Sequence, residues 1–174
     1  MFARHLRAEV LRGETSGDHR ETRERQLAAA AVAAQVALLA AQVVLRRRHD
    51  WPTPAAVKLG TGAVTVAGAA VIGAAGSSLG RGLTASPLPN PHAELRTDGL
   101  YRFVRHPIYT GVLAMSWART AASGDRRQVA LSVLLMLLLY SKSTLEEQVL
   151  ARRFSAYPSY AAGTPRFIPC VSHR

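Results

Sequence analysis

The sequence predicts an all-α, polytopic membrane protein with about four transmembrane helices, the last two of which form a C-terminal helical hairpin. Hydrophobic residues make up 48% of the 174-residue chain and charged residues only 19%. The charges gather between long uncharged runs, a pattern that amphipathic helices of soluble proteins do not show. Two of these runs, of 19 and 22 residues, are close to the length that crosses a bilayer.

The chain begins with a charged segment and a first membrane helix. Residues 1–26 carry both signs of charge and few large apolar side chains, so we expect a flexible tail ahead of a membrane domain at 27–174. We expect the tail to be retained, because it is long and acid-containing for a signal peptide. The uncharged run 27–45 predicts a helix of about 28 Å, with a buried helix of a soluble protein as the alternative. Gln35 and Gln42 lie seven residues apart on one face, which indicates packing against protein there.

The second membrane helix is predicted over 59–80. This run has no charge, is bracketed by Lys58 and Arg81, and follows Pro52 and Pro54, which break any preceding helix. Small residues spaced four apart predict that another helix approaches it closely. The pairs with this spacing are Ala69 with Gly73 and Gly76 with Gly80.

An ordered loop and a helical hairpin are predicted to follow. Segment 80–106 contains several prolines and glycines and cannot be one long helix. A third helix is expected from His106 or Pro107 toward Ala121, because proline suits the first helical turn. After a turn at 123–127, a fourth helix is expected to begin in the most hydrophobic run and to continue as a polar helix to about residue 154. Because both apolar stretches are shorter than a full span, a tightly turned hairpin is favoured, and residues 155–170 should form turns.

The net charge of +11, from 22 Lys and Arg against 11 Asp and Glu, indicates either a nucleic-acid partner or loops at an anionic membrane surface. The arginines flank apolar segments, so we expect membrane lipids and no nucleic acid as partners. Positive charge lies on both sides of the first helix. Placing the N terminus, the 81–106 loop and the C-terminal helix in the cytoplasm collects more Lys and Arg there. The single cysteine, Cys170, cannot form an intramolecular disulfide.

Polar side chains gather at the predicted start and end of the hairpin. One group surrounds the start of the third helix, a second lies near the end of the fourth, and a third follows it on the same side of the membrane. Their members are Tyr101, Arg105, His106 and Tyr109; Lys142, Glu146 and Glu147; and Tyr157, Tyr160 and Arg166. The two ends of a helical hairpin lie side by side, so the first two groups should meet. Charged residues at membrane depth usually line a cavity or mark a site. The alternative is a set of interfacial anchors with an ordinary helix salt bridge.

The motifs themselves indicate a family. "GLYRFVRHPIYTG", a later "EE" and "FSAYPSYAAGTPRFIP" closely resemble the integral-membrane methyltransferases of the isoprenylcysteine carboxyl methyltransferase and phospholipid methyltransferase superfamily. The likeness runs from near Lys58 to Pro169. It implies an S-adenosylmethionine-dependent enzyme whose cofactor site is a cytoplasmic loop and helix with no Rossmann domain. The chain accordingly shows no glycine-rich strand-to-helix fingerprint.

The resemblance also implies roles for individual residues. Lys142 falls where carboxyl methyltransferases have a basic residue that pairs with the substrate, with lysine in place of arginine and the bidentate fork therefore lost. From its own charge, Arg105 is the other residue expected to hold the acceptor in line. The residues implied for cofactor contact are Gly99, Leu100, Tyr101, His106, Pro107, Ile108, Tyr109, Gly111 and Glu146. Relatives are often basic at 161–163, where this chain has Ala-Ala-Gly, so any such contact is absent or comes from Arg153 or Arg166.

The expected reaction is methyl transfer to a lipophilic or prenylated small molecule, with a carboxylate as the favoured acceptor. An amine or thiol acceptor, including a phospholipid, would need a base. His106 and Glu147 are the candidates, although Arg105 should make His106 resist protonation. A non-catalytic membrane scaffold is the second alternative. No cluster at metal-ligand spacing occurs, the expected location is an inner or plasma membrane, and the oligomeric state is open.

Overall fold

The computed structural model describes residues 22–23, 26–45, 48, 50–83 and 94–169, and these residues form helices and no strands. The all-α prediction is therefore confirmed for this part of the chain. Predictions for most of the N-terminal tail, for Pro87, Pro89 and Pro91 and for Cys170 lie outside the described residues. The elements are an N-terminal helix Gln26–Val44, α2 Ala55–Leu79, η1 Gly80–Gly82, η2 Gly99–Arg102, α3 Pro107–Ser123, α4 Arg126–Arg153 and α5 Tyr157–Gly163.

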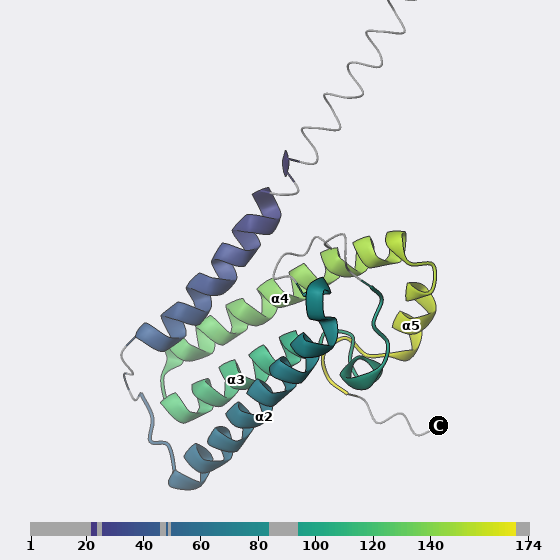
Figure 1. Ribbon diagram of the computed structural model, residues 1–174. Coiled ribbons are helices and arrows are strands. Elements are labelled where there is room, and N and C mark those ends of the chain that lie inside the picture. Colours follow the sequence, from purple (N-terminus) through teal and green to yellow (C-terminus); the bar gives the residue numbers. More distant parts are fainter. Residues whose placement is uncertain (1–21, 24–25, 46–47, 49, 84–93, 170–174) are drawn as a thin grey trace, which may run out of the picture.

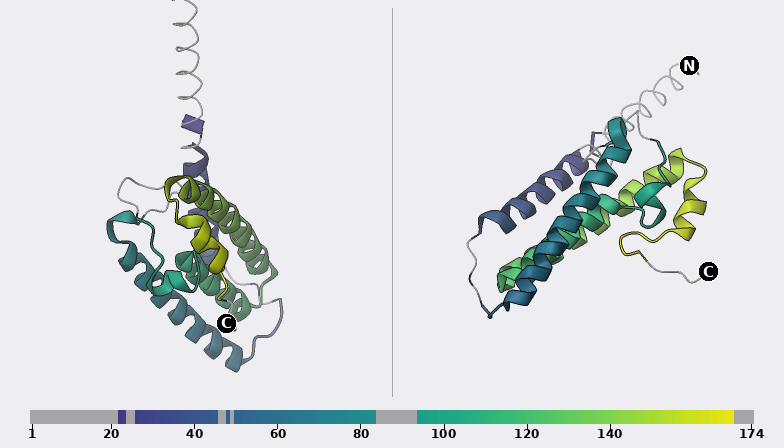
Figure 2. Two further views of the ribbon diagram at one scale, coloured as in Figure 1. Left: turned by 90° about the vertical axis from the view of Figure 1, so that its right-hand side faces the viewer. Right: turned by 60° about the horizontal axis from the view of Figure 1, so that its bottom comes forward.

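The four long helices lie alongside one another and the chain reverses direction between successive ones (Figure 1). Short helix α5 covers one end of this bundle, beside η2 (Figure 2). The start of the N-terminal helix, the start of α3 and the end of α4 share this end, which we call the α5 end. At the opposite end lie two connections, one between the N-terminal helix and α2 and one between α3 and α4. The amide of Trp51 donates to the carbonyl of Gly124 at 3.3 Å and so joins these two connections. The predicted C-terminal hairpin is α3 and α4.

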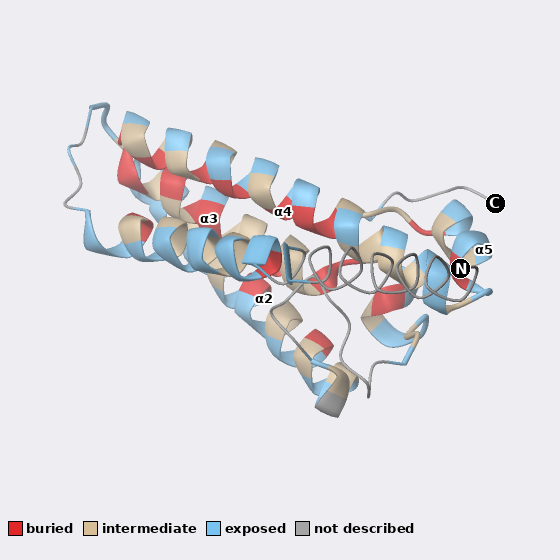
Figure 3. Cartoon of the chain, turned by 90° about the horizontal axis from the view of Figure 1, so that it is seen from above, coloured by how far each residue is buried: buried red, intermediate tan, exposed pale blue. Residues whose placement is uncertain are grey.

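Three helices are long and apolar enough to cross a membrane: Gln26–Val44, Ala55–Leu79 and Arg126–Arg153. Helix α3 has 17 residues and is shorter, so a fourth span stays a prediction. Many large apolar side chains of these helices face outward, among them Leu59, Val66 and Val44, which are 80%, 71% and 77% exposed. Figure 3 shows this outward exposure along α2, whereas buried residues gather between the helices. So much exposed apolar surface suits a hydrocarbon surrounding.

Helices α2 and α3 approach each other through glycines. A Cβ atom on Gly111 would lie 2.6 Å from the carbonyl oxygen of Gly68 and 2.7 Å from Cγ1 of Ile72. The residues that were predicted to pack closely, Ala69 with Gly73 and Gly76 with Gly80, are not those that meet α3. Gly73 and Gly80 have no atom within 4 Å of the corresponding position, because α2 turns a different face to its neighbour.

The hairpin turn is fixed by Gly124 and Asp125. Gly124 has a φ of 61°, a left-handed conformation that glycine adopts without a steric penalty. The fully buried Asp125 caps α4 by accepting from the amide of Arg127 at 2.9 Å, and it also accepts from the amide of Arg48 at 3.1 Å. Hydrogen bonds from the Arg127 side chain hold the pKa of Asp125 well below its usual range. The aspartate therefore remains charged and ties the two connections together.

The N-terminal helix is held by polar contacts from the face that sequence spacing predicted. Gln42 is 2% exposed, and its amide nitrogen donates to the hydroxyl of Ser116 at 2.7 Å and to that of Ser132 at 3.3 Å. The backbone carbonyl of Gln42 accepts from Arg119 Nε at 2.6 Å and from Gln128 Nε2 at 3.1 Å. The prediction that this face packs against protein is confirmed.

Most predicted boundaries lie within a few residues of the observed ones, with one element missed. Helix α3 starts at Pro107 as expected and extends to Ser123, and α4 is one continuous helix through its polar part. The expectation that residues 155–170 form only turns was wrong, because Tyr157–Gly163 is helical. Pro158 lies in the first turn of this helix, where a missing N–H costs nothing.

Candidate active site

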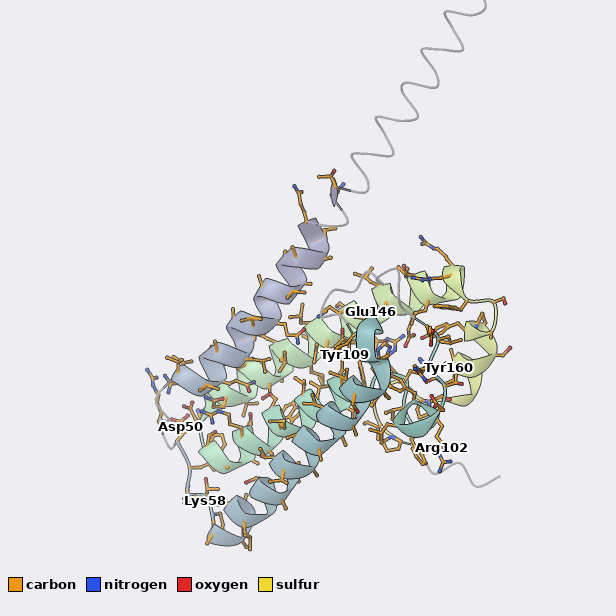
Figure 4. The ribbon with its side chains drawn as sticks, in the orientation of Figure 1. Asp50, Lys58, Arg102, Tyr109, Glu146 and Tyr160 are labelled. Carbon is orange, nitrogen blue, oxygen red and sulfur yellow. The ribbon has the colours of Figure 1, made fainter. Side chains whose placement is uncertain are left out.

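A cavity of about 500 Å³ lies at the α5 end, where the N-terminal helix, α2, η2, α3, α4 and α5 meet. Its wall combines apolar side chains from α2 and α4 with polar ones from the loop and hairpin. The predicted site residues that line it are Tyr101, Arg105, His106, Pro107, Ile108, Tyr109, Lys142 and Glu146. The hairpin therefore brings together side chains that are some forty residues apart, and Figure 4 shows Tyr109 beside Glu146 with Tyr160 at the same end.

His106 lies between two carboxylates. Its Nδ1 is 3.4 Å from Glu146 Oε2 and its Nε2 is 3.0 Å from Glu147 Oε1. Burial disfavours the imidazolium, since His106 is only 9% exposed, but hydrogen bonds to Glu146 and Glu147 outweigh it and raise the pKa of His106. The expectation that neighbouring Arg105 would keep His106 neutral is corrected, because the two carboxylates face the ring more directly.

Arg105 fastens three segments together. Its Nε and Nη2 donate to Glu147 at 3.0 and 3.3 Å, and its Nη1 donates to the carbonyls of Ala161 and Thr164, both at 2.6 Å. The backbone continues this junction, since the amide of Arg105 donates to the carbonyl of Pro165 at 2.9 Å. The start of α3, the end of α4 and the segment after α5 are thereby held in register around the cavity.

Glu147 is the common partner of this junction. Arg166 donates to its two oxygens through Nε at 3.1 Å and Nη2 at 2.7 Å, in addition to the bonds from Arg105 and His106. The side chain of Glu147 is 13% exposed. With two guanidinium groups and an imidazole on one carboxylate, its oxygens are engaged in holding the site together.

Tyr109, Glu146 and Lys142 form the part of the cavity wall next to His106. The Tyr109 hydroxyl donates a short hydrogen bond to Glu146, and the Tyr109 ring stacks on the His106 ring with centroids 5.5 Å apart. Lys142 Nζ lies 5.4 Å from the Tyr109 ring centroid and donates to Gln35 Oε1 at 2.6 Å. This wall therefore presents one ammonium and one carboxylate to the same cavity.

Two tyrosines of α5 complete the cavity, and they differ in hydrogen bonding. The Tyr160 hydroxyl donates to the carbonyl of Tyr101 at 2.6 Å, and burial raises the pKa of Tyr160 to about 12. The Tyr157 hydroxyl is buried and has no hydrogen-bond partner among the described residues. Burial raises the pKa of Tyr157 as well, so its hydroxyl stays neutral.

Not every predicted contact lines the cavity. Gly99, Leu100 and Gly111 do not line the cavity. Gly111 instead allows α2 to approach α3 closely. Gly99 has a φ of 54° and allows the turn into η2, which places Tyr101. Arg153, one of the two residues expected to replace the missing basic contact, does not line the cavity, and its Cζ lies 5.3 Å from the Phe154 ring centroid. The wall also includes Tyr157 and Tyr160, which belong to the third polar group expected near this end of the helices. It further includes Gln35, for which the polar face of the first helix was the signal.

These features define a helical membrane protein with a mixed polar and apolar cavity at one end of its apolar helices. Within the described ranges no three His, Cys, Asp or Glu side chains come together as metal ligands. Residues 56–157 match the sequence model of the phospholipid methyltransferase family, and the chain belongs to that family. It is therefore a membrane methyltransferase, as the motifs indicated. Comparison with curated proteins and with solved structures gave no match.

Proposed function

We propose that this protein transfers a methyl group from S-adenosylmethionine to a carboxylate on a lipophilic acceptor, as in isoprenylcysteine-type O-methylation. One observation carries the proposal. A single cavity presents the Glu146–His106 pair and the Lys142 ammonium at the end of outwardly apolar helices. Such a cavity suits a polar cofactor from the aqueous side and an acceptor with a hydrocarbon tail from the membrane.

The residues present fit the proposed cofactor. About 500 Å³ is an ordinary size for a small-molecule site. Glu146 would hold an ammonium group, and the tyrosine rings in the wall offer flat apolar surfaces. The bound cofactor would supply a methyl group on a positively charged sulfonium.

The chain's own residues supply position and electrostatics. Lys142 would hold an acceptor carboxylate in line, and no general base is needed because a carboxylate has no proton to lose. Arg105 lies at the cavity but its donors are bound to Glu147 and to carbonyls, so we assign it to positioning the start of α3. Water would be displaced from the cavity by the bound cofactor and acceptor. A site with little water favours the loss of the sulfonium and carboxylate charges as the methyl–oxygen bond forms.

An amine acceptor, such as a phospholipid headgroup, is the second candidate, and the family description favours it. That reaction needs a proton acceptor. Both candidates from the sequence are engaged: His106 has a raised pKa and is held between two carboxylates, and Glu147 accepts from two arginines. This engagement supports the carboxylate acceptor.

A transfer assay separates these candidates. Purified protein in detergent would receive methyl-labelled S-adenosylmethionine and, in separate reactions, a prenylcysteine, phosphatidylethanolamine or a small thiol. We expect label in the prenylcysteine, released as methanol by alkali because methyl esters hydrolyse there. Alkali-stable label in phosphatidylethanolamine would instead establish the amine reaction.

We further propose that the α5 end faces the cytoplasm from an inner or plasma membrane. The cofactor is polar and soluble, so its site must open to the compartment that contains it. The start of the N-terminal helix, the 94–106 segment and the end of α4 share that end. This is the arrangement that collects the larger number of Lys and Arg on one side.

A further inference from the structure

The N-terminal helix Gln26–Val44 lies outside the region that matches the family, residues 56–157, yet it forms part of the cavity wall. Gln35 is the residue of this helix that lines the cavity. A site built from the matched region alone would lack this wall.

Gln35 contacts the cation of the proposed acceptor site. Its Oε1 accepts from Lys142 Nζ at 2.6 Å, and Lys142 is only 1% exposed. An amide oxygen orients an ammonium by a charge-assisted hydrogen bond but, unlike a carboxylate, does not neutralise it. Glu146, one helical turn further along α4, lines the same cavity. Lys142 and Glu146 therefore both line the cavity, and Gln35 holds the ammonium group by a hydrogen bond.

The position of Gln35 is set by the rest of its helix. Seven residues on, Gln42 bonds to Ser116 and Ser132, and its carbonyl accepts from Arg119. Seven residues are nearly two helical turns, so the two glutamines face the same side. Polar contacts far from the cavity therefore fix the rotation of the helix that carries Gln35.

We propose that Gln35 is a positioning residue of the active site, and that through Lys142 it sets the affinity for a lipophilic acceptor bearing a carboxylate. This inference rests on the proposed function. It assigns a role in acceptor selection to a helix that the family match does not include.

The most informative variant is Gln35→Glu, which is isosteric and places a carboxylate on Lys142. A carboxylate at position 35 would compete with the acceptor carboxylate for Lys142. We therefore expect the KM for the prenylcysteine to rise about tenfold, the size expected when the acceptor loses its hydrogen bond to a charged group. The kcat and the KM for S-adenosylmethionine should stay within about twofold, because Gln35 acts only through Lys142. In a Lys142→Met background, Gln35→Glu should raise the acceptor KM no further.

Gln42→Leu is the matched control on the same helix face. This variant loses the side-chain bonds to Ser116 and Ser132 but keeps the bonds that the backbone carbonyl at position 42 accepts from Arg119 and Gln128. The rotation of the helix should therefore be kept, so we expect a lower thermal stability and an unchanged acceptor KM. The inference alone is overturned if wild type methylates the prenylcysteine and Gln35→Glu leaves the acceptor KM unchanged. It is also overturned if Gln35→Glu raises the acceptor KM equally with and without Lys142, or if Gln42→Leu raises the acceptor KM as much as Gln35→Glu does. A wild type that methylates only amines overturns both this inference and the proposed acceptor.

Discussion

The adjacent residues Glu146 and Glu147 have different tasks because successive helical residues point about 100° apart. Glu147 faces the junction and accepts from Arg105, His106 and Arg166. Glu146 faces the cavity and accepts from Tyr109. Glu147 therefore holds the walls together, while Glu146, which also lies 3.4 Å from His106 Nδ1, lines the cavity.

Arg105→Lys should destabilise the fold although the charge is kept. Lysine has no planar fork and cannot bond to Glu147 and two carbonyls at once, which leaves buried acceptors unsatisfied. We expect the free energy of unfolding in detergent to fall by about 2–4 kcal/mol. The control is Arg102→Lys, an exposed arginine over the Phe103 ring, which should cost less than about 1 kcal/mol. Equal losses for the two variants would refute the junction role of Arg105.

His106 should make the stability depend on pH. Its folded-state pKa is raised above the ordinary value of 6.5, so the stabilisation is fully present below that value and is lost as pH rises through the raised pKa. The melting temperature of wild type should therefore decline from near-neutral to alkaline pH more steeply than that of His106→Gln. Parallel melting curves over this range would show that the protonated ring contributes nothing.

At the level of elements, the site depends on how closely α2 packs against the hairpin. The approach at Gly68 and Gly111 places the cavity-lining part of α2 against the start of α3. Sequence reasoning predicted a close approach but assigned it to Ala69, Gly73, Gly76 and Gly80. Spacing of four recurs on several faces of a helix rich in small residues, so spacing alone could not select the face.

Gly111→Ala should destabilise the α2–α3 contact. The added methyl would meet the backbone oxygen of Gly68 at 2.6 Å, so one helix must shift. We expect a loss of about 1–3 kcal/mol in the free energy of unfolding. Gly73→Ala is the matched control, because nothing lies within 4 Å of its Cβ position and alanine favours helix. A Gly111→Ala protein as stable as Gly73→Ala would contradict this packing.

At the scale of the whole molecule, the alternating helix directions bring the motifs to one end. The sequence predicted the class, most helix boundaries and the meeting of residues 101–109 with 142–147, because run lengths, prolines and a hairpin determine these. It did not predict α5 or the place of Gln35 in the cavity wall. Both depend on long-range contacts, such as Tyr160 with Tyr101 and Gln35 with Lys142. The polar face of the first helix indicates that this side packs against protein, but it does not identify the partner of Gln35.

The orientation can be tested with the single cysteine, Cys170, which directly follows the last described residue. A membrane-impermeant maleimide should fail to label it in intact cells and should label it after permeabilisation. A Lys58→Cys, Cys170→Ser protein is the matched control, because Lys58 lies at the opposite end (Figure 4). The cysteine at position 58 should react with the maleimide in intact cells. Labelling of Cys170 in intact cells would show that the orientation is the reverse of the one proposed.

The most direct test of the active-site assignment is titration of S-adenosylmethionine into purified protein. Wild type should bind, and both His106→Ala and Glu146→Ala should bind at least about tenfold more weakly, since each loses a charge-assisted contact. Asp50→Asn, at the opposite end, should bind like wild type (Figure 4). Equal affinities in all four proteins, or no binding by wild type, would contradict the cofactor site and favour a scaffold that performs no methyl transfer.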